Sequence, residues 1–228
     1  MTNELVKGVF ISEVKNRFLC LVSIDGNTVE CYIPSSCRLS NFLSLDGKEV
    51  LLKKTQGKKT RTKYSVYAVK FRRGFLLLNL LQANRAIEND IHRRVFSDLG
   101  VRKQVSRELT IEGYKSDLYI HDTKTLIEIK SLLTIEKKGV FPTVFSERAN
   151  NQLRKISQLL TGGYKVCYML VSLNPYVEYI ELSKLEPEFR NLFVECIEKG
   201  MMCMGVTLKL KDGKPIVNRR IEIKEIES

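Results

Sequence analysis

The chain has 228 residues, of which 43% are hydrophobic and 28% are charged. This composition excludes collagen-like, low-complexity and wholly disordered chains, and the length predicts one large domain or two small ones. Lys and Arg outnumber Asp and Glu by 38 to 26, so the formal net charge is +12, which favours a polyanionic partner.

Two further absences narrow the class of protein. No apolar run reaches the length that a membrane span needs, and the N-terminus lacks the charged and apolar segments of a signal peptide. The six cysteines form no Cys-x-x-Cys pair and no zinc-binding spacing. We therefore expect a cytoplasmic protein with reduced cysteines and no contact with membranes.

The first part of the chain is rich in short strand-like runs. β-Branched and aromatic residues gather at 9–14, 17–24, 28–34, 49–54, 64–71 and 75–81. Asp25-Gly26-Asn27 and Asp46-Gly47-Lys48 supply turns between them. We predict a domain over residues 1–82 that is a small antiparallel, OB-like β-barrel and binds nucleic acid.

The second part alternates between helices and strands. Helical periodicity covers 84–99, 146–160 and 186–199, with Ser146 as an N-cap. Strand-like runs cover 106–111, 114–121, 125–132, 164–173, 201–210 and 215–223. This order predicts a second domain over residues 83–228 with a mixed α/β fold.

A dense group of cations, the basic loop, lies within the predicted barrel. Its six members are Lys53, Lys54, Lys58, Lys59, Arg61 and Lys63. A positive barrel face attracts a phosphate backbone, so we expect these residues to bind nucleic acid with low sequence specificity. The alternative is a solvated hairpin that blocks edge-to-edge aggregation. Four aromatic residues interleave with the cations and are either stacking platforms or core residues: Tyr64, Tyr67, Phe71 and Phe75.

Asp117, Glu128 and Lys130 form the strongest candidate for chemistry. Positions two apart in a strand share a face, so Glu128 and Lys130 project together. Only a short turn separates the run 114–121, which contains Asp117, from the run 125–132, which contains Glu128 and Lys130. The two runs are therefore expected to be antiparallel neighbours. Two carboxylates fit a hard cation such as Mg²⁺ or Mn²⁺, and a lysine beside them fits metal-assisted phosphodiester hydrolysis. The pattern is similar to the PD-(D/E)xK nuclease signature.

The same spacing also has a plain interpretation. Glu-x-Lys occurs four times in the chain, and Asp212 stands ten residues before Glu222 in a second copy of the pattern. Exposed strands of a lysine-rich chain alternate Glu and Lys for solubility and cross-strand pairing. The copy at Glu128 is favoured because apolar strands and two helices surround it.

Residues 139–153 join the Glu128 strand to the second predicted helix. A helix N-terminus favours anions, so Arg148 in the first turn is a further candidate for nucleic-acid binding. Glu147 beside it is either an additional metal or water ligand or a complement to the helix dipole.

The chain as a whole resembles the sugar fermentation stimulation protein A family, described as DNA-binding proteins and candidate nucleases of DNA or RNA. The resemblance runs from about residue 15 to 210 and rests on ordered segments: 15–19, 25–26, 62–64, 79 with 83–85, 115–117, 127–131 and 141–153. It implies an N-terminal OB-like domain and a C-terminal PD-(D/E)xK-like domain. It also implies that Asp117, Glu128 and Lys130 are the signature positions, with Asp117 and Glu128 as metal ligands.

Three departures from the family pattern stand beside this resemblance. The family usually has Cys-Pro-Asn-Thr-Gly at residues 33–37, where this chain has Ile-Pro-Ser-Ser-Cys, and an Asp where Thr143 stands. Its first-helix glutamate corresponds to Glu88 or to Asn89. From the resemblance we expect a metal-dependent nuclease. Because of these departures, the alternative is a non-catalytic DNA-binding regulator that carries a vestigial nuclease domain.

Overall fold

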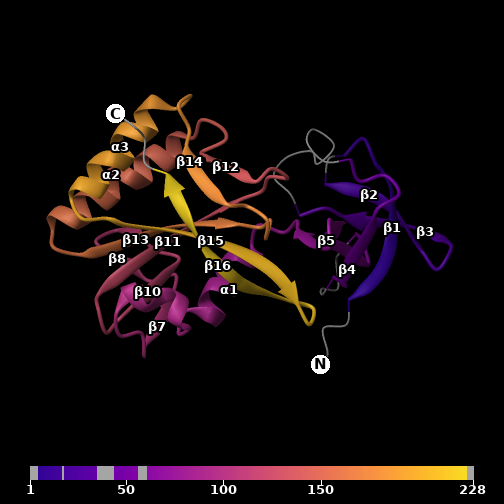
Figure 1. Ribbon diagram of the computed structural model, residues 1–228, viewed down its shortest axis with the longest axis horizontal. Helices are drawn as coiled ribbons and strands as arrows, with labels where there is room; N and C mark the ends of the chain where they lie inside the picture. Colours follow the sequence, from indigo (N-terminus) through magenta and orange to yellow (C-terminus); the bar gives the residue numbers. More distant parts are fainter. Residues whose placement is uncertain (1–4, 17, 35–43, 56–60, 225–228) are drawn as a thin grey trace.

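The computed structural model describes residues 5–16, 18–34, 44–55 and 61–224 (Figure 1). Its first sheet contains β1 (Val6–Glu13), β2 (Leu19–Ile24), β3 (Asn27–Tyr32), β4 (Glu49–Lys54), β5 (Tyr64–Phe71) and β6 (Gly74–Leu77). Its second part contains α1 (Gln82–Asp90), a 3-10 helix η2 (Arg94–Leu99), α2 (Glu147–Thr161) and α3 (Pro187–Glu198). The strands of that part are β7 (Val105–Arg107), β8 (Thr110–Ile111), β9 (Tyr114–Lys115), β10 (Leu118–Ile120), β11 (Thr125–Leu132), β12 (Lys138–Phe141), β13 (Lys165–Ser172), β14 (Tyr179–Leu182), β15 (Met202–Lys211) and β16 (Lys214–Lys224).

The first sheet closes on itself. Its strand order is β3-β2-β1-β4-β5-β6, and β3 also pairs in parallel with β5, so five strands form a barrel with an OB-like connectivity. Asp25 and Gly26 make the two-residue turn between β2 and β3, with φ angles of 50° and 80° that aspartate and glycine tolerate. The predicted barrel is therefore confirmed.

The second part is a mixed α/β domain, also as predicted. Eight strands follow the order β12-β14-β16-β15-β13-β11-β10-β7, with β11, β13 and β15 parallel in the centre. In Figure 1, α2 and α3 lie on one side of this sheet and α1 lies on the other. The predicted boundary between residues 82 and 83 lies in the first turn of α1.

The alternation of side chains along β11 divides the interior into two clusters. Ile127 and Ile129 belong to the cluster that α1 covers, whereas Leu126 and Leu132 belong to the cluster that α2 and α3 cover. Glu128 and Lys130 have the parity of the second set, so they point towards α2.

The cluster under α1 also joins the barrel to the second part, and we call it the shared cluster. From the barrel sheet it takes Leu51, Tyr67, Ala68 and Leu77, and from the second part it takes α1 together with the centre of the eight-stranded sheet. A backbone hydrogen bond of 3.3 Å from the Leu77 amide to the Leu173 carbonyl crosses the same boundary. The two parts therefore share apolar core as well as a linker.

The helix predicted over 84–99 is broken in the structure. It ends at Asp90, and Arg93 is extended with ψ near 154° before η2 begins. Asp90 accepts the Val217 amide at 2.7 Å, and the Arg93 guanidinium donates to the Val217 carbonyl at 2.7 Å. These contacts with β16 fix the chain at the break and outweigh the local helical periodicity.

Two further strand predictions need correction. The runs 106–111 and 114–121 are each interrupted, because the small β8–β9 hairpin turns away from the main sheet and leaves Asp117 between β9 and β10. Strands β12 and β14 were not predicted. They pair in parallel with each other, and β14 pairs with β16, at an edge that only the folded chain creates.

Candidate active site

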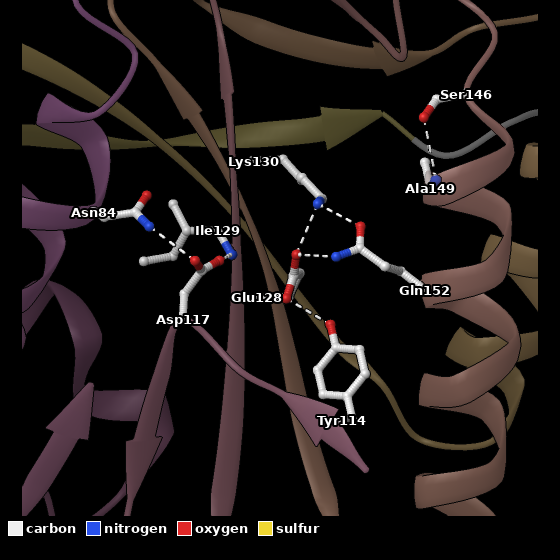
Figure 2. A network of polar contacts seen from close by, with 9 residues as sticks. All are labelled: Asn84, Tyr114, Asp117, Glu128, Ile129, Lys130, Ser146, Ala149 and Gln152. Carbon is white, nitrogen blue, oxygen red and sulfur yellow. Dashed lines mark hydrogen bonds and ion pairs between the residues drawn. The ribbon is translucent and has the colours of Figure 1, made fainter. Parts of the chain in front are cut away.

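Glu128 and Lys130 form a close ion pair on β11. The Lys130 ammonium lies 2.7 Å from Glu128 Oε1, and the Glu128 side chain is almost fully buried. Charged side chains are rarely buried unless they are paired and hydrogen-bonded. The predicted projection of these two residues to one side of β11 is present in the structure (Figure 2).

Asp117 lies beside this pair on the adjoining chain segment. Leu118 pairs with Ile127 across β10 and β11, so Asp117, one residue earlier, lies next to Glu128. Its Oδ1 accepts the Asn84 amide at 2.8 Å, and its Oδ2 accepts the backbone amide of Ile129 at 2.7 Å. The three predicted residues are thus gathered at one place, although Asp117 is held by α1 and by the backbone of β11 (Figure 2).

Two neutral side chains hold Glu128 and Lys130 in place. Tyr114 on β9 donates its hydroxyl to Glu128 Oε2 at 2.5 Å. Gln152 on α2 donates to Glu128 Oε1 at 3.1 Å and accepts from the Lys130 ammonium at 2.7 Å. Each oxygen of Glu128 is therefore occupied, and one glutamine amide bridges the acid and the base (Figure 2).

The helix that carries Gln152 starts where the sequence predicted. Ser146 is the N-cap of α2, and its Oγ accepts the Ala149 amide at 3.2 Å. The cap fixes the start of a helix whose inner face buries Leu153 and Ile156 against the sheet. Gln152, one residue before Leu153, is thereby directed at the edge of that contact, over β11.

Burial sets the electrostatics of the site. It raises the pKa of Asp117 above its ordinary value, and the negative charge of Glu128 raises it further. Burial also raises the pKa of Tyr114, and the charge of Glu128 adds to this effect, so its hydroxyl stays a proton donor. For Asp117, burial and the charge of Glu128 therefore outweigh the stabilising contacts from the Ile129 amide, Lys130 and Asn84.

A groove lies at the C-terminal end of β11 and is lined mainly by the residues that follow this strand. Its volume is about 430 Å³, and its lining starts at Leu132, two residues after Lys130 and of the same parity. The lining continues through Thr134 and Glu136 to Val140 and Thr143. Thr143, at the position where the family usually has an Asp, thus faces this groove.

Most of the basic loop lies at the ends of β4 and β5. Lys54, Arg61 and Lys63 are exposed, whereas Lys53 is half-buried with its ammonium 5.9 Å from the centre of the Tyr67 ring. Lys58 and Lys59 lie outside the described residues. Arg61 forms an ion pair with Glu30, with 3.0 Å between Arg61 Nε and Glu30 Oε1.

The four aromatic residues near the basic loop belong to packed clusters. Tyr67 is buried in the shared cluster, and Phe75 packs against it. Tyr64 and Phe71 pack against the barrel core. Of the two interpretations given above for these residues, the structure supports the core.

The other candidate residues have varied positions. Arg148 and Glu147 are exposed in the first turn of α2. Glu88 on α1 forms an ion pair with Arg107. The α1 side chain that donates a hydrogen bond to Asp117 is instead Asn84, one turn earlier. Among the described residues, no group of three or more His, Cys, Asp and Glu side chains has the geometry of a metal site.

The second copy of the acidic pattern does not form a site. Asp212 lies in the turn between β15 and β16 with a φ of 50°, and Glu222 is exposed near the other end of β16. Ten residues of extended strand separate them by roughly 30 Å. The structure thus distinguishes two copies that the sequence pattern alone does not.

Sequence reasoning missed Tyr114, Gln152 and the contact made by Asn84. These residues come from β9, α2 and α1, and no spacing rule connects those elements to β11. A partial signal existed, because Asn84 and Gln152 both lie within segments that resemble the family.

Comparisons with known proteins cover both parts of the chain. A family model described as the SfsA N-terminal OB domain matches residues 14–78, and one described as the sugar fermentation stimulation protein RE domain matches residues 81–214.

No helix among the described residues is long and apolar enough to cross a membrane.

Individual relatives agree with these matches. The sugar fermentation stimulation protein homolog of Desulfitobacterium hafniense is 24% identical over 228 residues, covering 97% of this chain and 96% of the relative. That of Thermotoga neapolitana is 25% identical over 210 residues, covering 91% and 90%. The structure of Pyrococcus furiosus SfsA in complex with Ca²⁺ has the same fold, with a TM-score of 0.79 and 19% identity over 97% of this chain and 96% of that one. The resemblance drawn from short segments is thus confirmed, and the chain belongs to the sugar fermentation stimulation protein family.

Proposed function

We propose that this protein binds nucleic acid through its barrel and hydrolyses phosphodiester bonds at Asp117, Glu128 and Lys130. The observation that carries the proposal is the buried Glu128–Lys130 pair with a second carboxylate, Asp117, beside it. An acidic pair with an adjacent lysine is the arrangement expected of a PD-(D/E)xK-like nuclease. A merely structural ion pair gains little from a second buried acid, because the two negative charges repel each other.

The carboxylates fit a hard divalent cation. Asp117 and Glu128 would hold such an ion through their oxygens, which Mg²⁺ and Mn²⁺ prefer, and its charge would offset the negative charge that raises the pKa of Asp117. When bound, such an ion neutralises phosphate charge and activates a water molecule. The structure of Pyrococcus furiosus SfsA is a complex with Ca²⁺, another oxygen-preferring cation, so a relative of the same fold binds an ion of this class.

The chain's own residues have separable roles in the proposal. Lys130 orients the attacking water and offsets the negative charge that develops on the phosphate. Gln152 is a positioning residue, because its amide fixes the Lys130 ammonium relative to Glu128. Tyr114 and Asn84 keep the two carboxylates in place through their hydrogen bonds.

The cations of the barrel and of α2 supply the binding half of the proposal. Exposed Lys54, Arg61, Lys63 and Arg148 contribute positive charge to the surface, and Lys53, Lys58 and Lys59 complete the set expected from the sequence. Contacts of this kind are made to phosphates, so they favour low sequence specificity.

The test is cleavage of labelled single- and double-stranded DNA and RNA with Mg²⁺, Mn²⁺ or EDTA. We expect metal-dependent cleavage by the wild type and a loss of about 100-fold or more in Asp117→Asn and in Glu128→Gln, with binding retained. Glu222→Gln is the matched control and should cleave normally, because that acid is exposed and isolated. Cleavage that survives EDTA or Asp117→Asn would contradict the mechanism.

A second candidate function is supported by two observations. No third acidic ligand joins the pair among the described residues, and Thr143 replaces the Asp usual in the family. A binding-only regulator with a vestigial nuclease domain accounts for this. The same assay separates the two candidates, since that regulator binds every substrate and cleaves none under any metal condition.

A further inference from the structure

A recess on the barrel surface lies apart from the candidate active site. Its volume is about 300 Å³, and its lining comes from the β1–β2 connection, the end of β3 and the two described ends of the β4–β5 connection. The lining residues are Asn16, Phe18, Leu19, Tyr32, Thr55, Arg61 and Thr62. We call this recess the ring-pair pocket.

Two aromatic rings, Phe18 and Tyr32, belong to the lining of the ring-pair pocket. The Phe18 and Tyr32 ring centres are 6.3 Å apart, and their planes differ by 24°, so the rings are stacked with an offset. Tyr32 remains 39% exposed although it carries a large aromatic ring. An exposed ring that stacks on a partly buried second ring offers a flat surface on which a further planar group can stack.

The backbone around these rings is fixed in place. Asn16 Oδ1 accepts the Phe18 amide at 3.1 Å, and the Leu19 amide donates to the Asn16 carbonyl at 2.9 Å. Tyr32 pairs with Leu19 across β2 and β3. Because both rings are attached to this paired backbone, binding orders few additional groups, which favours affinity.

The charge around the pocket indicates the chemistry of its occupant. Arg61 lines it directly, and exposed Lys54 and Lys63 lie at the ends of the adjoining strands. The nearby acid, Glu30, is paired with Arg61. A flat aromatic surface with a cationic rim fits a planar base joined to a phosphate backbone, whereas an apolar peptide would not use the cations.

We propose that the ring-pair pocket binds an unpaired nucleobase of single-stranded nucleic acid, stacked on Phe18 and Tyr32. Bases of a duplex are enclosed in the helix, whereas unpaired bases can turn out and stack on aromatic side chains. This inference rests on the proposed nucleic-acid binding and deepens it, because phosphate contacts alone do not distinguish single strands from duplexes.

The experiment measures binding of the full chain to labelled oligonucleotides by fluorescence anisotropy in EDTA, which prevents cleavage. The ligands are single-stranded DNA, single-stranded RNA, the matching DNA duplex and a single strand of abasic sites with the same number of phosphates. We expect the wild type to bind the base-bearing strands about 5- to 100-fold more tightly than the abasic strand.

Single substitutions test whether the Phe18 and Tyr32 rings cause the preference for base-bearing strands. Tyr32→Ala and Phe18→Ala should lower affinity for the base-bearing strands towards that for the abasic strand, whereas Tyr32→Phe should retain the wild-type preference. Ile11→Ala, at an exposed position of β1 outside the pocket, is the matched control and should bind as the wild type does. Circular dichroism checks that each variant is folded.

The outcomes separate this inference from the function on which it rests. Equal wild-type affinity for base-bearing and abasic strands, or an unchanged preference in folded Tyr32→Ala, would overturn the pocket while leaving phosphate binding intact. In that case Lys58→Glu with Lys59→Glu still weakens binding to every ligand. Absence of wild-type binding to any of the four ligands would overturn both proposals together.

Discussion

Asp117 lies half-buried beside a second carboxylate, and its pKa is raised, first by burial and then by the charge of Glu128. The folded chain therefore holds the Asp117 proton more tightly than the unfolded chain does. Ionising the group costs the folded state more than the unfolded state, so its contribution to stability falls as the pH rises above the unfolded value of about 3.9.

The direction of this pKa shift predicts how the substitution Asp117→Asn changes stability with pH. In EDTA, the free energy of unfolding of Asp117→Asn minus that of the wild type should increase between about pH 4 and the raised folded pKa, and then become constant. At neutral pH, Mg²⁺ or Mn²⁺ should raise the melting temperature of the wild type and leave that of Asp117→Asn unchanged. Urea denaturation and thermal melts make these measurements, and a difference that is independent of pH would contradict the cause given for the pKa shift.

At the residue scale, the sequence predicted the acids and the lysine but not their supports. The period of two along β11 was sufficient to put Glu128 and Lys130 on one side, and a short turn was sufficient to bring Asp117 near them. Tyr114, Asn84 and Gln152 approach from other elements, and their directions depend on how α1 and α2 pack. Pattern alone could not supply those directions.

At the scale of elements, α2 connects helix capping to the site. Ser146 accepts the Ala149 amide at 3.2 Å, and Gln152 lies in the following turns of the same helix. The cap satisfies one of the amide groups that a helix start leaves without an intrahelical partner.

Replacing Ser146 with Ala should lower stability by about 1 kcal/mol, which corresponds to about 2–4 °C in melting temperature for a domain of this size. Ser146→Asp keeps a capping oxygen and should retain the wild-type melting temperature. Differential scanning calorimetry checks both variants. If Ser146→Asp lost as much stability as Ser146→Ala, the hydroxyl would act by some means other than capping.

Long, regular elements were predictable, whereas the short strands at one end of the eight-stranded sheet were not. α2 and α3 follow a clear helical periodicity, and β11, β13, β15 and β16 are long apolar or alternating runs. β12 and β14 have four residues each and depend on partners distant in the sequence. The break after Asp90 depends in the same way on Val217, which lies 127 residues later.

At the scale of the whole molecule, the shared cluster makes the two parts energetically dependent on each other. Leu77 is fully buried and belongs to this cluster, although it ends a strand of the barrel sheet. We therefore expect the wild type to unfold in a single calorimetric transition.

Leu77→Ala should lower stability by about 2–5 kcal/mol while keeping one transition, because the cavity lies in core that both parts use. Leu52→Ala is the matched comparison, since Leu52 is equally buried but belongs to the cluster inside the barrel. It should also lower the stability of the whole chain while keeping one transition, because a barrel weakened in its own core still unfolds together with the second part. Two separate transitions in the wild type would contradict the dependence.

The pleat of β11 separates two requirements that selection imposes on the chain. Residues on one face of the strand join the packing that holds the barrel to the rest, and residues on the other face carry the acid and the lysine. A lineage that lost the side chains of Glu128 and Lys130 would keep every apolar contact of the shared cluster. Under the proposed function, the residues of the site can therefore change over evolutionary time while the packing that joins the two parts of the chain is kept.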